Sequence, residues 1–308
     1  MSDATLVRPA ARPGLRVSRH LTPYLLIAPV LAVLAVLLAY PLAIGLYTSL
    51  TSLRIGRWDQ AQFVGLDNYV RIIESGSYFA AAGVTFNFGL MCVVAEMPLG
   101  LGLALLLNRE LPGIGVYRAL CLVPLMMPNI VSALIWRSML DPTGVINHIL
   151  APLGFMNYTW LADPNTVLFG LLIIDVWMMT PQVLILMLAA LQGIPSEIYE
   201  AARVDGADGW QRFRSITFPL ILPFALVSLM IRSIELIQVF DVIFVTTQGG
   251  PAQASKVLHI AAYREGFVDG YLGNGMAYAV MLGLTVLVVV LVVARRYLAA
   301  QASAYGEA

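Results

Sequence analysis

Residues 200–219 read EAARVDGADGWQRFRSITFP, a polar stretch between two apolar runs. Pro195 and Ser196 precede it, and Glu200 falls in the following turn, a combination that favours the start of a helix near residue 196. We expect this helix to end at Gly206, because glycine readily adopts the left-handed backbone conformation that stops a helix. The stretch therefore begins with a short helix of about two turns.

A second helix is predicted directly after the first. Asp208 with Gln211 three residues later fits a capping box. In this second helix Trp210, Phe213 and Thr217 recur at helical spacing and form one face, until proline opens the next apolar run. The whole segment, residues 196–217, is predicted to be two short helices joined by a tight turn.

This segment has two interpretations. An amphipathic connector would lie on the lipid headgroups. A docking surface would instead receive another protein, and the sequence Glu200-Ala201-Ala202 suits that role because small side chains beside a carboxylate permit close approach but provide little to anchor in lipid. Residue spacing alone leaves both open.

The composition indicates a membrane protein. Of 308 residues, 59% are hydrophobic and 12% charged, and the mean hydropathy is +0.82, far above that of a soluble domain. The formal net charge is zero, which excludes a broad basic surface for nucleic acid.

The fold class predicted from the apolar runs is all-α, a polytopic membrane protein with six transmembrane helices. The runs are 21–50, 79–107, 116–140, 166–191, 218–245 and 275–293. The first run is longer than the apolar core of a cleavable signal peptide, about 7–15 residues, so we expect a retained anchor, bent at Pro29 and Pro41. The expected divisions are a basic tail (1–20), a transmembrane domain (21–297) and a C-terminal tail (298–308).

The basic residues predict the orientation. With both ends in the cytoplasm, eleven arginines lie inside and six basic residues lie outside, which agrees with the positive-inside rule. The inner set is Arg8, Arg12, Arg16, Arg19, Arg109, Arg118, Arg203, Arg212, Arg214, Arg295 and Arg296, and the outer set is Arg54, Arg57, Arg71, Arg137, Lys256 and Arg264. The same orientation places the 196–217 segment in the cytoplasm.

Several motifs together resemble one family. Glu200-Ala201-Ala202, then Gly206, Ile216 and Pro219, resemble the cytoplasmic loop of permease subunits of binding-protein-dependent ABC importers. The sequences FVGLDNY (63–69), DPTGVIN (141–147) and FD (240–241) followed by TQGGP (247–251) are similar to the carbohydrate and glycerol-phosphate branch of that family.

The resemblance implies a function and partners. The first short helix would be a coupling helix that docks in a cleft of an ATPase subunit, through Glu200, Ala201, Ala202, Asp205, Gly206 and Ala207. The chain would work with two ATP-binding subunits, a second permease expected to be a different chain, and an external solute-binding protein. It would pass a sugar, polyol or glycerol-phosphate solute across the bacterial cytoplasmic (inner) membrane by alternating access.

No catalytic or metal site is predicted. The lone lysine, Lys256, follows Ser255, so the chain has no Gly-Lys-Ser/Thr phosphate loop, and ATP hydrolysis is expected on a separate subunit. Cys92 and Cys121 lie in apolar runs and are expected to pack as small hydrophobic side chains. The three histidines show no ligand spacing. We therefore expect no cofactor and no enzymatic activity.

Polar side chains inside the spans are candidates for the solute path, because an ionisable group at membrane depth is costly unless it is paired or wetted. Arg232 and Glu235 are three residues apart and can form an ion pair, which would either lock the bundle or line the path. The remaining candidates are Asn87, Asp175, Trp177 and Gln238, although for each one taken singly packing or interhelical hydrogen bonding is the favoured role.

Two other classes compete with the importer. An ion-coupled secondary transporter would use the carboxylates of Glu96, Asp175 and Glu235 as proton or sodium sites. An intramembrane enzyme would need a converging nucleophile or metal set, and none is visible in the sequence.

Overall fold

The computed structural model describes residues 22–109, 111–154 and 158–305. Within these ranges five helices are long and apolar enough to cross a membrane, or six if the bent pair Ile114–Met126 and Asn129–Met139 counts as one span. The chain divides into two compact units, Met1–Tyr47 and Thr48–Ala308. The prediction of an all-α membrane protein is confirmed.

The first unit holds an apolar helix that changes its winding near a proline. Helix α1 (Thr22–Leu34) passes into a π-helical turn (Ala35–Ala39), and α2 (Tyr40–Ser49) follows. The wider turn lies just before Pro41, whose ring would clash with the carbonyl of residue 37 in a regular α-helix. The proline predicted to bend this run therefore coincides with an observed irregularity.

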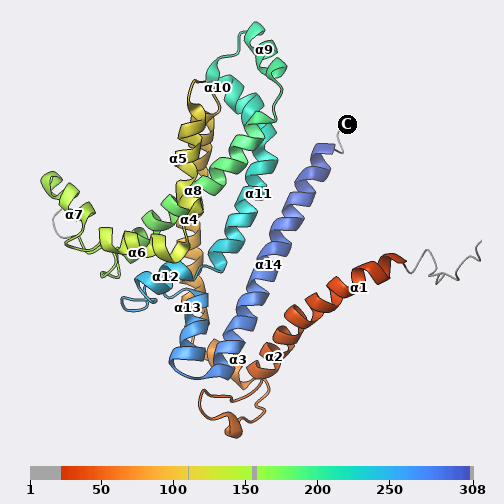
Figure 1. The fold of residues 1–308 in the computed structure, drawn as a ribbon, viewed down its shortest axis with the longest axis vertical. Helices are drawn as coiled ribbons and strands as arrows, with labels where there is room; N and C mark the ends of the chain where they lie inside the picture. Colours follow the sequence, from red (N-terminus) through yellow and green to blue (C-terminus); the bar gives the residue numbers. More distant parts are fainter. Residues whose placement is uncertain (1–21, 110, 155–157, 306–308) are drawn as a thin grey trace, which may run out of the picture. The chain divides into compact units, whose positions relative to one another are not determined.

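The second unit contains twelve α-helices among its described residues. They are α3 (Asp67–Glu74), α4 (Ser77–Leu107), α5 (Ile114–Met126), α6 (Asn129–Met139), α7 (Val145–Leu150), α8 (Val167–Gln192), α9 (Ser196–Val204), α10 (Gly209–Arg212), α11 (Phe218–Ile237), α12 (Asp241–Thr246), α13 (Leu258–Tyr263) and α14 (Leu272–Tyr305). Within this unit α9 and α10 lie at one end of the bundle, and α3 and α13 lie at the other (Figure 1).

Three of the expected spans differ in detail from the observed helices. The run 116–140 is two helices, α5 and α6, bent by 95°. The break falls at Met127, which is extended (ψ 141°) because Pro128 disfavours the helical conformation in the residue before it. The run 218–245 is interrupted between Ile237 and Asp241. The last helix continues to Tyr305, into the expected C-terminal tail.

Helices α4 and α8 pack closely, and a glycine makes this possible. A Cβ built on Gly100 would lie 2.6 Å from the Cβ of Val183, so only glycine fits there without a shift. Ala104, one turn further along α4, is completely buried. Gly102 has no atom within 4 Å of such a Cβ and takes no part in the contact. The close-packing surface expected on this span is therefore formed by Gly100 and Ala104.

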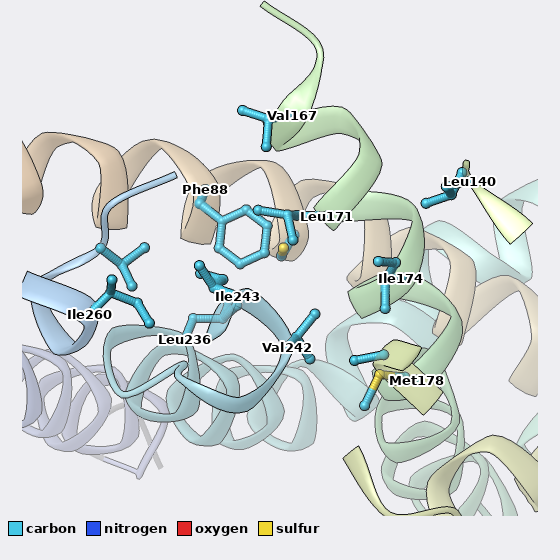
Figure 2. Packing of buried hydrophobic residues seen from close by; sticks show 13 residues of the cluster. Phe88, Leu140, Val167, Leu171, Ile174, Met178, Leu236, Val242, Ile243 and Ile260 are labelled. Carbon is cyan, nitrogen blue, oxygen red and sulfur yellow. The ribbon is translucent and has the colours of Figure 1, made fainter. Parts of the chain in front are cut away.

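The largest apolar core surrounds α8 (Figure 2). Phe88 and Cys92 of α4 meet Leu171 and Ile174 of α8, and all four are completely buried. Ile243 of α12 closes the same cluster, so the short helix after the break in the fifth span is held by the core. Cys92 packs as the sequence predicted.

The polar end of the second unit is fastened by a buried amide. Nδ2 of Asn68 donates hydrogen bonds of 2.8 Å to the carbonyl oxygens of Ser49 and Thr51. Gly273, at the start of α14, packs against the same segment, because a Cβ at this position would lie 2.0 Å from the Thr51 carbonyl oxygen. This anchors α3 and α14 to one turn.

Candidate functional site

A buried ion network joins three helices of the second unit. Nε of Arg232 (α11) donates to Oε2 of Glu96 (α4) at 2.7 Å, and Nη2 donates to Oδ2 of Asp175 (α8) at 2.7 Å. Nη1 donates to Oε2 of Glu235, one turn along α11, at 2.8 Å. The i,i+3 ion pair expected from the spacing of Arg232 and Glu235 is therefore present, as part of a larger set.

Three side chains of the network are buried, and the fourth is exposed to solvent. The side chains of Glu96, Arg232 and Asp175 are 0%, 3% and 4% exposed, whereas that of Glu235 is 42% exposed. Gln182 of α8 donates to the other Glu235 oxygen at 2.9 Å. Burying unpaired charges in this setting would cost several kcal/mol, so the guanidinium is what allows Glu96 and Asp175 to remain inside.

A cavity of about 530 Å³ opens beside the network. Its polar wall consists of Asn129, Asp175, Gln182, Arg232, Glu235, Gln238, Asp241 and His259. It lies where two irregular segments meet: the α5–α6 bend supplies Asn129, and the gap between α11 and α12 supplies Gln238. Helix breaks of this kind at membrane depth are tolerated where the freed backbone groups line a cavity.

The candidates for the solute path are not all in one place. Asp175, Arg232, Glu235 and Gln238 line the cavity. Asn87 is exposed on α4, outside the cavity lining. Trp177 packs edge-on against Trp136, with ring centroids 5.7 Å apart, at the margin of the apolar core.

Sequence reasoning missed part of this site. The sequence indicates Glu96 only as an ion site of a competing transporter, and it gives no reason to select Gln182, Asn129 or His259. One signal was present: Arg232 is the sole basic residue in the middle of any predicted span, so a buried Glu96 or Asp175 had no other cation to pair with. In the sequence, only Pro128 indicated the bend that brings Asn129 to the cavity.

One group of side chains has metal-like spacing. Ligand atoms of Cys92, Glu96 and Asp175 lie within 4.8 Å of one another. Both carboxylates, however, already bind the guanidinium of Arg232. Both acids of this group are therefore already paired with a cation of the chain itself.

The segment 196–217 forms a second candidate site, whose first helix ends in a complete Schellman motif. Gly206 adopts φ +79°, its N–H donates to the Arg203 carbonyl at 3.1 Å, and the Ala207 N–H donates to the Ala202 carbonyl at 2.9 Å. The predicted end of the helix at Gly206 is confirmed. The hydrogen bonds that close the turn are all local.

The second short helix begins as predicted and then continues into the membrane span. The Asp208 carboxylate accepts from the Gln211 N–H at 2.7 Å, and the Gln211 side chain accepts from the Asp208 N–H at 3.0 Å, which completes the capping box. A π-helical turn (Phe213–Thr217) joins this helix to α11 without a gap. Tyr199 of α9 and Thr217 are linked through their hydroxyl groups at 3.1 Å, so α9 is tied to the base of α11.

The segment presents small and apolar side chains at its surface. Val204 is 88% exposed and Trp210 is 66% exposed, while Glu200 and Ala201 are also exposed. Ala202 faces inward and is buried. An exposed apolar surface on a capped loop is typical of a site that contacts another protein or the membrane surface.

The turn after α6, within the motif of residues 141–147, is held by the carboxylate of Asp141. The backbone N–H of Thr143 donates to the Asp141 carboxylate at 3.0 Å and its hydroxyl donates at 2.7 Å, and these bonds lower the pKa of Asp141 below its ordinary value. Gly144 is required here, because a Cβ would lie 2.5 Å from the Met139 carbonyl oxygen.

Together, the apolar helices, the charged cavity between them and the exposed helical loop define a membrane permease. A model of the family described as "Binding-protein-dependent transport system inner membrane component" matches residues 96–303. The chain belongs to this family.

Individual relatives agree with that assignment. The trehalose/maltose transport system permease protein MalF of Thermococcus litoralis is 38% identical over 269 residues, covering 86% of this chain and 89% of that protein. The sn-glycerol-3-phosphate transport system permease protein UgpA of Yersinia pestis is 33% identical over 282 residues, covering 90% and 93%.

A solved structure shares the fold. A chain in the crystal structure of a bacterial ABC transporter, one involved in import of the acidic polysaccharide alginate, matches with a TM-score of 0.78 at 24% identity, covering 91% of this chain and 96% of that one. The family model and the curated relatives together show that the present protein is a permease subunit of an ABC importer. The resemblance noted in the sequence is confirmed, and the ion-coupled alternative is not favoured.

Proposed function

We propose that this chain carries a carbohydrate, polyol or glycerol-phosphate solute across the inner membrane, through the cavity beside the Arg232 network, and that residues 196–217 couple this movement to ATP hydrolysis on another subunit. The observation that carries the proposal is the capped loop with its exposed Val204 and Trp210. It directly precedes α11, the helix that bears Arg232 and Glu235.

A mechanical path supports this coupling. The π-helical turn joins the loop to α11 without interruption, and the contact between Tyr199 and Thr217 fixes α9 to the same helix. A force applied to α9 would therefore reach the Glu235 side of the cavity through one continuous helix. Alternating access needs such a rigid element with two arrangements.

The partners in this proposal are two ATP-binding subunits, a second permease expected to be a different chain, and an external solute-binding protein. The family description supports the last of these. The distribution of basic residues supports cytoplasmic termini and a cytoplasmic loop. We assign the solute path to Asp175, Arg232, Glu235 and Gln238, which line the cavity. The proposed ATPase contact is formed by Glu200, Ala201, Asp205, Gly206 and Ala207, with the buried Ala202 supporting the loop from within.

Co-purification from the native membrane tests the coupling role. We expect an ATPase subunit to co-purify with the tagged chain and to be lost from Glu200→Lys and Gly206→Pro variants, since proline cannot adopt the φ of +79° at Gly206. A Glu74→Lys variant, altered at an exposed carboxylate on α3, is the matched control and should retain the ATPase. Loss of the subunit from the control as well, or its retention by both loop variants, would contradict the proposal.

A further inference from the structure

More negative than positive side chains line the cavity. Among the described lining residues there are three carboxylates, Asp175, Glu235 and Asp241, and one guanidinium, Arg232. Behind the guanidinium lies a fourth carboxylate, Glu96. Protonation of any one of these carboxylates still leaves the set negative.

The arginine is not available to a solute. Its Nε and Nη2 donate to both oxygens of Glu96, at 2.7 and 3.0 Å, Nη2 donates also to Asp175, and Nη1 donates to Glu235. The side chain is only 3% exposed. Bidentate recognition of a phosphate or carboxylate uses two arginine N–H groups that point in the same direction, and here the four hydrogen bonds of the guanidinium go to the protein's own carboxylates.

The groups that remain open to the cavity suit hydroxyl groups. Glu235 is 42% exposed, and its oxygens can accept further hydrogen bonds beyond those from Arg232 and Gln182. The amides of Asn129 and Gln238 are exposed and both donate and accept. A solute rich in hydroxyl groups can satisfy all of these groups. An anion would face Glu235 and Asp241, and the described lining residues include no cation beyond the paired Arg232.

We propose that this wall of the cavity selects uncharged, polyhydroxylated solutes and rejects those that carry a phosphate or carboxylate. The inference rests on the proposed function, and it narrows the class of solute. The distinction is a real one within the family, since the named relatives include both a trehalose/maltose permease and a glycerol-3-phosphate permease. In a partly desolvated cavity, repulsion between like charges outweighs the hydrogen bonds that an anion could form.

The test uses the complete transporter, reconstituted in proteoliposomes with its own partner subunits and binding protein. ATPase stimulation is measured with maltose and trehalose as neutral probes and with sn-glycerol 3-phosphate and glucose 6-phosphate as anionic probes. We expect stimulation by a neutral probe and none by the anions. Stimulation by an anion as strong as that by any neutral probe would overturn the charge inference but leave the importer function standing. Stimulation by no probe would overturn the proposed carbohydrate class and the charge inference together.

A Glu235→Gln variant distinguishes selection by the permease from selection by the binding protein, because the binding protein is unchanged. Glutamine keeps the shape of the side chain and removes one negative charge. We expect the KM for the neutral probe to rise on the order of tenfold and inhibition by sn-glycerol 3-phosphate to strengthen by a similar factor. A Glu74→Gln variant is the control and should match the native chain.

A purely structural role for Glu235 would show a different pattern. The maximal rate would then fall, with the ratio of neutral to anionic affinity unchanged, and this result would overturn the inference. Thermal unfolding of both variants in detergent distinguishes such an effect from a loss of folded protein.

Discussion

The two candidate sites are built in opposite ways. In the ion network, the bonds of Arg232 reach residues 136 and 57 positions away, on α4 and α8. In the 196–217 segment, every cap bond joins residues at most five positions apart, as in the bond from Ala207 to Ala202. The network is charged and buried except at Glu235, whereas the loop is exposed and held largely by backbone hydrogen bonds.

This difference predicts how each site fails. A change in the network leaves an uncompensated charge between helices, so its effect should spread to the stability of the whole second unit. A change in the loop alters one turn, so its effect should remain local and appear in partner binding. The following substitutions test that contrast.

The largest effect is expected from Arg232→Met. Removal of the guanidinium leaves Glu96 and Asp175 buried without a cation, at a cost of about 3–5 kcal/mol in the free energy of unfolding. Thermal unfolding in detergent, with the yield of folded protein, measures the loss. Arg71→Met, at an exposed position on α3, is the control and should change stability little. Equal stability of the two variants would mean that the network is not what holds these helices together.

A smaller loss is expected where the helices that carry the network touch. Gly100→Leu would force a side chain into the 2.6 Å space before Val183 and should destabilise the protein by about 1–3 kcal/mol, as overpacking does. Gly102→Leu lies on the same helix with open space around it and should be close to neutral. The difference in unfolding temperature between the two variants isolates the packing effect, and its absence would contradict the α4–α8 contact.

The smallest and most local effect is expected from Gly206→Ala. An L-residue at φ +79° costs about 1–2 kcal/mol, which should weaken the Schellman motif and speed amide hydrogen exchange in the turn about tenfold. Gly209→Ala is the control, because Gly209 has open space and lies at the start of a helix, where alanine is tolerated. The unfolding temperature should be unchanged in both variants. A global loss of stability in Gly206→Ala would remove the distinction between the two sites.

The sequence by itself determined the two capped helices of the 196–217 segment and the approximate positions of the spans. Gly206 and the pair Asp208 and Gln211 act through the backbone within one or two turns, so their geometry can be read from neighbouring residues. The lengths of the apolar runs are likewise set by the thickness of the bilayer.

The tertiary structure decided which polar residues meet. Glu96, Asp175 and Arg232 were visible as costly charges, but their meeting depends on how α4, α8 and α11 are rotated about their axes, and that depends on contacts such as Gly100 against Val183. The 95° bend at Pro128, which brings Asn129 to the cavity, was equally hidden, because prolines inside α4 and α8 leave those helices continuous. Local hydrogen bonds can be predicted from local sequence, whereas a cavity is formed by side chains from distant helices whose rotation only packing decides.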